Sequence, residues 1–150
     1  MIKQIFLVIF VLFFKQVFAE PLALDAPERK QLIAMGYEIV KEDKDDKFTI
    51  AEIGSSRIIF SKNEDRLAIS RIFNRERKLN STDELELQRI INSFNDKYAY
   101  QFSINKEALT ATLYIFGSYE PKTFAKVVRL MDKVNTIFNT EPNFYKLVNN

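Results

Sequence analysis

Hydrophobic and polar residues alternate along two adjacent runs in the second half of the chain, residues 98–104 and 109–116. The apolar positions are Tyr98, Tyr100, Phe102 and Ile104, then Leu109, Ala111, Leu113 and Ile115. A period of two is typical of strands with one buried face. The polar segment Asn105-Lys106-Glu107 lies between them. We therefore expect a β-hairpin here.

A segment with helical spacing flanks the hairpin on each side. In the first, Leu87, Ile90, Ile91 and Phe94 recur at i, i+3, i+4 and i+7. Ser81-Thr82-Asp83-Glu84 predicts a capping box at its start, with the Ser81 hydroxyl as the acceptor. The second helix is expected from Pro121 to residue 138. Its apolar stripe is Phe124, Val127, Val128, Met131, Val134 and Phe138. Helix, hairpin and helix can bury their faces together, so residues 81–138 should form the core.

The sequence pattern in the first half of the domain predicts one helix followed by four short strands. The helix should cover residues 26–35, with Asp25 and Glu28 at its start and Gly36 as its stop. Strands are expected around residues 37–41, 48–53, 57–61 and 67–73. Their connections of two to five residues favour an antiparallel meander. The alternation slips near Ile72, which predicts a bulge or a strand end there.

The predicted order is therefore α-β-β-β-β-α-β-β-α. It indicates an α+β domain with a single antiparallel sheet, meander plus hairpin, and helices packed mainly on one face. We expect the domain to cover residues 20–138. Residues 139–150 would form a C-terminal tail that is apolar enough to dock.

Residues 1–19 differ from the rest of the chain. Lys3 precedes an unbroken apolar run from Ile5 to Phe14, and Val17-Phe18-Ala19 follows. This is typical of a signal peptide cleaved between Ala19 and Glu20. The alternative is a membrane anchor, but a spanning helix needs about 20 apolar residues. Lys15 ends this run too early, so we expect an exported protein, periplasmic or secreted, with no membrane span after cleavage.

The balance of charge argues against a nucleic-acid partner. The chain has 22 basic and 20 acidic residues. Lys3 and Lys15 fall in the expected leader, so the remaining chain has 22 − 2 = 20 basic residues against 20 acidic ones. A nucleic-acid-binding protein needs an excess of cations to neutralise phosphates.

The sequence contains no His and no Cys. Hydrolases that rely on a Ser-His or Cys-His pair are thereby excluded, and so are disulfides. The usual zinc and copper ligands are absent as well. We expect a disulfide-free protein without catalytic residues, bound metal or cofactor, and not an enzyme.

Two local patterns suggest chemistry but do not fit it. Asp43, Asp45 and Asp46 begin like a calcium loop, yet the sixth position is Phe48 and the twelfth is Gly54. A solvated hairpin turn fits better. Ser103 and Lys106 match a bare Ser-x-x-Lys, but this spacing in a strand places the two side chains on opposite faces.

Aromatic residues near the end of the hairpin are the candidate binding residues. Tyr114, Phe116 and Tyr119 lie on, or just past, the strand face opposite Leu113 and Ile115. If helices cover only one face of the sheet, these aromatics face solvent or a partner. The alternative is that the tail covers this second face through Phe144 and Leu147.

The element order and two short motifs resemble the YbjN-type domain family, which is related in fold to type III secretion chaperones. The motifs are Leu32-Ile33-Ala34-Met35-Gly36-Tyr37 at the end of the first helix and Ile90-Ile91-Asn92-Ser93-Phe94-Asn95 in the second. The resemblance spans residues 26–138. It implies a compact α+β domain, often dimeric, that binds proteins and catalyses nothing.

The leading hypothesis is therefore an exported module that binds another protein or a second copy of itself. One alternative is a periplasmic inhibitor or immunity protein against an exported enzyme. Another is an enzyme that uses the carboxylates near residues 41–47.

Overall fold

The computed structural model of the protein describes residues 23–63, 65–75 and 78–148. It confirms the α+β class and the single antiparallel sheet. The strands are β1 (Glu38–Asp43), β2 (Phe48–Ile53), β3 (Ser56–Asn63), β4 (Arg66–Asn74), β5 (Gln101–Ile104) and β6 (Ala108–Phe116). The helices in the described residues are α2 (Ala26–Ala34), α3 (Ser81–Lys97), α4 (Pro121–Met131), α5 (Val134–Phe138) and α6 (Phe144–Val148).

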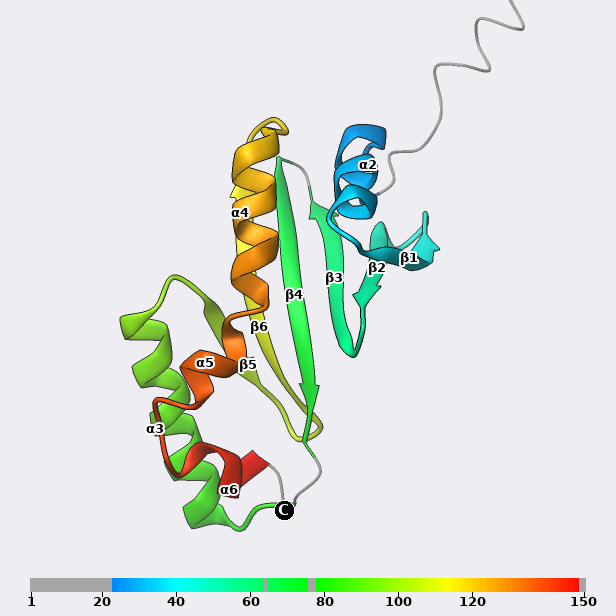
Figure 1. The fold of residues 1–150 in the computed structure, drawn as a ribbon. Coiled ribbons are helices and arrows are strands. Elements are labelled where there is room, and N and C mark those ends of the chain that lie inside the picture. Colours follow the sequence, from blue (N-terminus) through cyan, green and yellow to red (C-terminus); the bar gives the residue numbers. More distant parts are fainter. Residues whose placement is uncertain (1–22, 64, 76–77, 149–150) are drawn as a thin grey trace, which may run out of the picture.

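The sheet has six strands in the order β1-β2-β3-β4-β6-β5, and every neighbouring pair is antiparallel (Figure 1). The first four strands form the predicted meander. β4 then pairs with β6 along its whole length, from Arg66 opposite Phe116 to Asn74 opposite Ala108. The hairpin is thereby joined to the meander, and β5 becomes the far edge.

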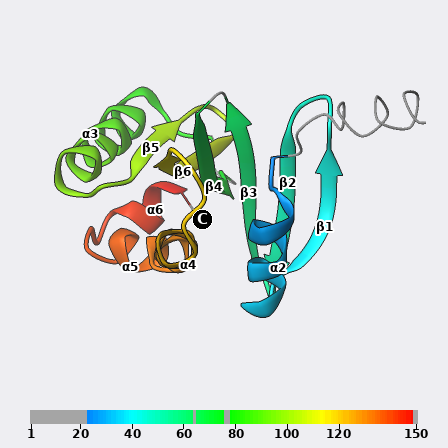
Figure 2. The same ribbon diagram turned by 90° about the horizontal axis from the view of Figure 1, so that it is seen from above.

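The helices pack against one face of the sheet, with α3 at its end beside β5 (Figure 2). Alternate strand residues point into this covered face and are buried: Ala51, Ile58, Phe60, Leu67, Ile69, Leu109, Ala111 and Leu113. Phe60 of β3 stacks on Phe124 of α4 with ring centres 6.0 Å apart. This contact anchors α4 over the middle of the sheet.

A second part of the core is almost wholly aromatic. The rings of Phe94, Phe102, Phe138 and Phe144 come from α3, β5, α5 and α6, and neighbouring ring centres lie 4.2 to 6.1 Å apart. Pairs at such distances are favourable beyond the area that they bury. This cluster fixes the last two helices against α3.

The start of α3 differs from the prediction. Its N-cap is Asn80, whose side-chain oxygen accepts the backbone N–H of Asp83 at 2.9 Å, and Ser81 is the first helical residue. Asn is as good an N-cap as Ser, so the cap lies one residue earlier. Glu84, the expected partner of the cap, instead binds the guanidinium of Arg75 at 2.7 Å.

The predicted strand 98–104 was too long at its start. α3 continues to Lys97, and β5 begins only at Gln101. Tyr98 and Tyr100 therefore lie in the connection. The Tyr100 hydroxyl donates to the carbonyl of Leu130 at 2.6 Å, which ties this connection to α4.

The predicted helix 121–138 is broken after Met131 into α4 and α5. Asp132 caps α4, and its carboxylate accepts a hydrogen bond from the Tyr37 hydroxyl at 3.3 Å. The break redirects the chain, so that Phe138 packs edge-on against Phe73 of β4, 5.0 Å away. A continuous apolar stripe gave no sign of this change in direction.

The expected irregularity at Ile72 was wrong, because β4 pairs with β6 without a shift in register. The inward position is occupied by Arg71, which donates to the carbonyl of Met131 at 3.3 Å and lies over the Phe73 ring. A polar residue at an inward position made the alternation appear to slip. The bulge in the sheet is in β1, between Ile39 and Lys41.

The C-terminal segment docks, as its apolar residues predicted. Phe144, Leu147 and Val148 of α6 are buried, and α6 packs against α3. The expected leader, residues 1–19, lies outside the described residues. Within the described residues, no helix is long and apolar enough to cross a bilayer.

Candidate functional site

The face of the sheet opposite the helices is the candidate binding surface, and we call it the open face. Here the strand pairings place Phe48, Ser61, Ala68 and Tyr114 in one row across β2, β3, β4 and β6. Adjacent strands lie about 4.8 Å apart, so the two aromatic residues are separated by roughly 14 Å. The small side chains of Ser61 and Ala68 lie between them.

Tyr114 and Phe116 lie next to each other on this face, with ring centres 6.2 Å apart. Phe116 is 68% exposed, which is unusual for a Phe on a strand. We call Phe48, Tyr114 and Phe116 the aromatic strip. An exposed apolar ring of this size costs free energy in water unless a partner covers it.

Each side of the aromatic strip carries a cation. The Arg66 guanidinium lies 5.1 Å from the centre of the Tyr114 ring, and the Lys41 ammonium lies 5.2 Å from that of Phe48. Cation–π contacts at these distances orient the long side chains over the rings. The open face therefore offers apolar area together with positive charge.

Of the three predicted binding residues, the structure brings two together. Tyr119 lies in the connection between β6 and α4, on the covered side. Its ring packs edge-on against Phe124 at 5.8 Å, and its hydroxyl donates to Oε1 of Gln31 in α2. Tyr119 thus joins α2 to α4 and does not extend the aromatic strip.

The alternative of a tail that covers the second face does not match the position of α6. Phe144 lies in the aromatic core beside Phe94 and Phe138, and α6 contacts α3. Both are on the covered side of the sheet. The open face carries no other described element of the chain (Figure 2).

Sequence reasoning did not place Phe48 in the candidate site. Its alternation with Ile50 indicated a strand but not which face the pair would occupy. In β2 the buried positions are Thr49 and Ala51, so Phe48 and Ile50 point to the open face. The signal was obscured because small residues take the inward positions.

The acidic segment 43–47 forms the turn between β1 and β2. The Asp43 carboxylate accepts the backbone N–H groups of Asp45 and Asp46, both at 3.0 Å, and Lys47 has a positive φ of 51°. This is an Asx turn that closes a hairpin. In the part of the chain that the structure describes, no group of three or more acidic side chains could hold a metal ion.

The titratable groups with raised pKa values lie away from the open face. Burial, reinforced by the nearby Asp132 carboxylate, raises the pKa of Tyr37 to about 12. Burial also raises the pKa of Glu28, whose carboxylate accepts the backbone N–H of Asp25 at 2.6 Å. Both groups help to seat α2 and its flanking residues, so they have structural roles.

The motif Asn92-Ser93-Phe94-Asn95, which carried much of the predicted resemblance, has a clear structural use. Phe94 is the centre of the aromatic core, in contact with Tyr98, Phe102, Phe138 and Phe144. The Asn95 carboxamide accepts the backbone N–H of Phe102 at 2.6 Å and donates to its carbonyl at 3.0 Å. Phe94 and Asn95 therefore join α3 to β5 through their contacts with Phe102.

No family model and no curated protein matches the sequence. Among solved structures, the fold is similar to that of YbjN, a proposed transcription regulator from E. coli, with a TM-score of 0.57. The match covers 77% of this chain and 90% of that chain at 10% sequence identity. At this identity the likeness concerns the fold alone, and the predicted resemblance to YbjN-type domains is confirmed at that level.

Proposed function

We propose that this protein is a non-enzymatic binding module that takes up another protein on the open face of its sheet. The observation that carries the proposal is the aromatic strip, in which an exposed Phe116 lies beside Tyr114 on a face without helices. The fold similarity to YbjN agrees with this role but adds no partner.

The aromatic and basic residues of the open face support a protein partner. Tyr, Phe and Arg are enriched at the core of protein interfaces. Tyr and Arg are also among the residues that most often dominate the binding energy. Tyr114, Phe116 and Arg66 occur together here. Lys41 and Arg66 favour a partner segment with carboxylates beside its apolar residues.

Export and the absence of catalysis belong to the same proposal. The apolar run from Ile5 to Phe14 supports a cleaved leader, and hence a periplasmic or secreted module. A sequence without His and Cys lacks the commonest general base and the commonest thiol nucleophile. Both points support binding over turnover.

The double variant Tyr114→Ala, Phe116→Ala tests the proposal. We expect the wild-type protein to form a stable complex, with a partner or with a second copy, and the double variant to lose it. The measurement is the mass in solution of the purified mature protein, alone and with a partner captured from a lysate and then purified.

Leu85→Ala is the matched control, since Leu85 is 73% exposed on α3, away from the open face. It should leave the complex intact. Thermal unfolding should show that both variants are folded. A complex that survives the double variant, or a wild-type protein that stays monomeric and captures nothing, would contradict the proposal.

A further inference from the structure

The exposed side of α4 carries four cations in one row. Lys122, Lys126 and Arg129 are spaced by four and three residues, which places them on one side of α4. Lys133 follows just past the end of α4 and lines the same hollow. At a rise of about 1.5 Å per residue, the row is roughly 16 Å long. We call these four residues the basic row.

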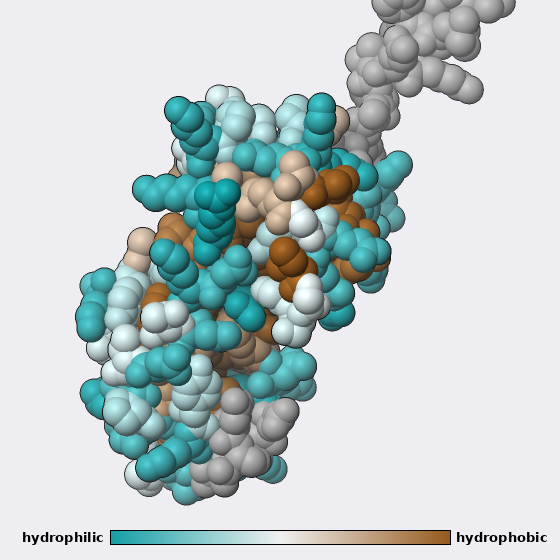
Figure 3. Space-filling model, in the orientation of Figure 1, coloured by the Kyte–Doolittle hydropathy of each residue, from teal (hydrophilic) through white to brown (hydrophobic). Residues whose placement is uncertain are grey.

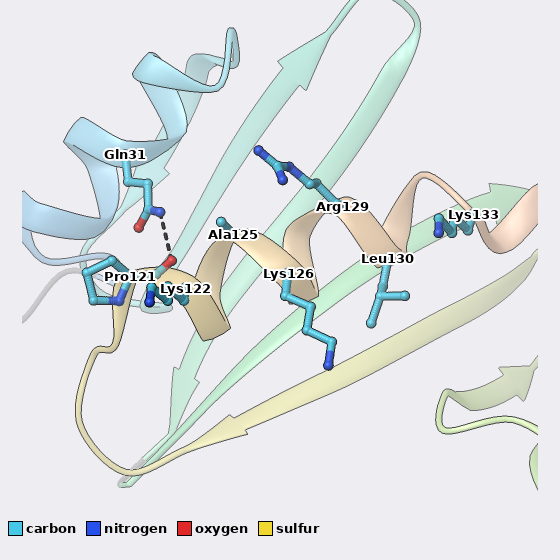
Figure 4. A pocket seen from close by; sticks show the side chains of 8 residues that line it. All are labelled: Gln31, Pro121, Lys122, Ala125, Lys126, Arg129, Leu130 and Lys133. Atoms are coloured by element: carbon cyan, nitrogen blue, oxygen red, sulfur yellow. Dashed lines mark hydrogen bonds between the residues drawn. The ribbon is translucent and has the colours of Figure 1, made fainter.

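The basic row lines a shallow hollow of about 570 Å³ (Figure 4). Its other lining residues are Gln31, Pro121, Ala125 and Leu130. In Figure 4 the long side chains of Lys126 and Arg129 splay apart to either side of the row, with Lys122 near the start of α4 and Lys133 past its end. In Figure 3, which looks onto this side of the molecule, hydrophilic residues project over α4 and hydrophobic residues gather over α2.

Acidic residues stand at the two ends of α4 and not within it. The Glu120 carboxylate caps the start of the helix by accepting the backbone N–H groups of Lys122 and Thr123, and the Asp132 carboxylate accepts from the Tyr37 hydroxyl. α4 has no acidic residue, and none lines the hollow. None of the four cations forms an ion pair with a described residue, whereas cations on other elements do. Examples are Arg29 with Glu42, Arg57 with Glu52, Lys62 with Asp25 and Arg89 with Glu86. Like charges this close repel one another, so an anionic ligand gains from all four.

The α2 side of the hollow is held in place. The Gln31 amide donates to the Pro121 carbonyl at 2.8 Å and accepts from the Tyr119 hydroxyl. These bonds fix α2 against the start of α4. A ligand that lies along the row therefore meets a preorganised wall, which lowers the entropic cost of binding.

We propose that the basic row binds an acidic segment of a protein partner, a run of Asp or Glu side chains in extended conformation along α4. Alternate side chains of an extended chain repeat every 6.6 Å or so, and the cations repeat every 4.5 to 6 Å or so, a mismatch that long side chains absorb. Ala125 and Leu130 can accept the aliphatic parts of such a segment.

The dimensions of the surface favour a peptide over a lipid surface. A bilayer would touch the tips of Lys122, Lys126 and Lys133 but could not enter the hollow. The row is also one helix wide, which suits a single chain. This proposal does not rest on the function of the open face, which lies on the other side of the sheet.

The test measures binding of a fluorescent poly-glutamate peptide of roughly eight residues, a length that spans the row, to the mature protein at low and high salt. We expect binding that weakens with salt, as exposed ion pairs do. The variant Lys122→Gln, Lys126→Gln, Arg129→Gln should lower the affinity by about tenfold or more, given the loss of three ion pairs.

The matched control is Lys44→Gln, Lys78→Gln, Lys106→Gln, which removes the same charge from exposed lysines in three connections away from α4. It should bind the peptide like the wild-type protein, and so should Tyr114→Ala, Phe116→Ala. The last result separates this proposal from that for the open face. A poly-glutamine peptide should not bind.

Three results would overturn the proposal. The first is no binding of poly-glutamate at low salt. The second is an equal loss of affinity in both triple-glutamine variants, which would mean that peptide binding depends on the net charge of the protein and not on the basic row. The third is tight, row-dependent binding to vesicles with anionic lipids together with weak binding of the peptide, which would make the row a membrane-contact surface.

Discussion

Asn95 completes the outer edge of the sheet with a side chain in place of a strand. Its carboxamide offers one acceptor and one donor to the backbone of Phe102, as a neighbouring strand would. Only the carboxamide of Asn or Gln holds a donor and an acceptor side by side in one plane, as a peptide group does. The contribution of residue 95 to stability should therefore depend on its hydrogen-bonding groups and not on its side-chain volume.

Replacing Asn95 with Ala should lower the free energy of unfolding by about 1–3 kcal/mol, since it leaves two backbone groups without their partner. Asn95→Asp should not restore stability, because a carboxylate cannot donate to the Phe102 carbonyl. Urea unfolding measures both. Asn92→Ala is the control, as the Asn92 carboxamide accepts from the Gln88 side chain on the exposed surface of α3. An equally large loss of stability in Asn92→Ala would refute the role of Asn95.

Tyr37 should make the free energy of unfolding fall at alkaline pH. Its pKa rises from 10 in the unfolded chain to about 12 in the fold. Because the pKa is raised by folding, the contribution of Tyr37 to the free energy of unfolding is fully present below pH 10 and is lost as pH rises through about 12. The loss should be on the order of 2 kcal/mol.

Comparison with Tyr37→Phe isolates this contribution. At neutral pH the variant should be less stable by about 1 kcal/mol, the value of one hydrogen bond. The difference should shrink and reverse between about pH 10 and 12. Parallel curves of stability against pH for Tyr37→Phe and wild type would refute the role of Tyr37.

At the scale of elements, α6 is part of the core although it is only five residues long. Phe144, Leu147 and Val148 are buried, and Phe144 stacks on Phe138 at 4.2 Å. Its removal would expose the aromatic cluster to water.

A chain that stops before Phe144 should be less stable by several kcal/mol, since each large apolar side chain contributes about 2 kcal/mol on burial. Thermal unfolding of the shortened and full chains measures the difference. Phe144→Ala alone should reproduce most of it, at roughly 3–5 kcal/mol. An unchanged melting temperature would mean that α6 is not docked in solution.

Both edge strands are protected from further pairing. β1 carries a bulge and the charged residues Glu38, Lys41, Glu42 and Asp43, and β5 has Asn95 on its outer side. Such features oppose edge-to-edge association. A partner is therefore expected to bind the face of the sheet and not to add a strand to it.

For the whole molecule, the fold class, the element order and the one-sided arrangement of helices could be predicted from periodicity. Local patterns could not predict that β4 pairs with β6, because this pairing joins residues far apart in the sequence. The composition of the open face depends on that pairing. Tyr114 and Phe116 were therefore foreseeable, but their relation to Phe48 and Arg66 was not.

Other errors arose where a side chain did not follow the usual pattern. Arg71 occupies an inward position because its guanidinium reaches a backbone carbonyl and an aromatic ring. Tyr119 was assigned to the wrong side because the connection after Gly117, with its φ of 81°, turns the chain back toward α2. The spacing of the basic row was visible in the sequence, but the hollow that its side chains line together with Gln31 of α2 became apparent only in three dimensions.

The position of β4 in the middle of the sheet has a consequence for the order of events during synthesis. The meander of β1 to β4 can form as soon as residue 74 has been made, with β3 on one edge of β4, but β6 is made only after the whole of α3. Until then β4 has a free edge and its apolar residues have no cover from α4. Pairing between strands that are far apart in the sequence is slow, because the entropy of the intervening chain is lost before the new contacts stabilise the fold. A nascent chain arrested between α3 and β6 would thus be the species most prone to aggregate, and the one most in need of a chaperone.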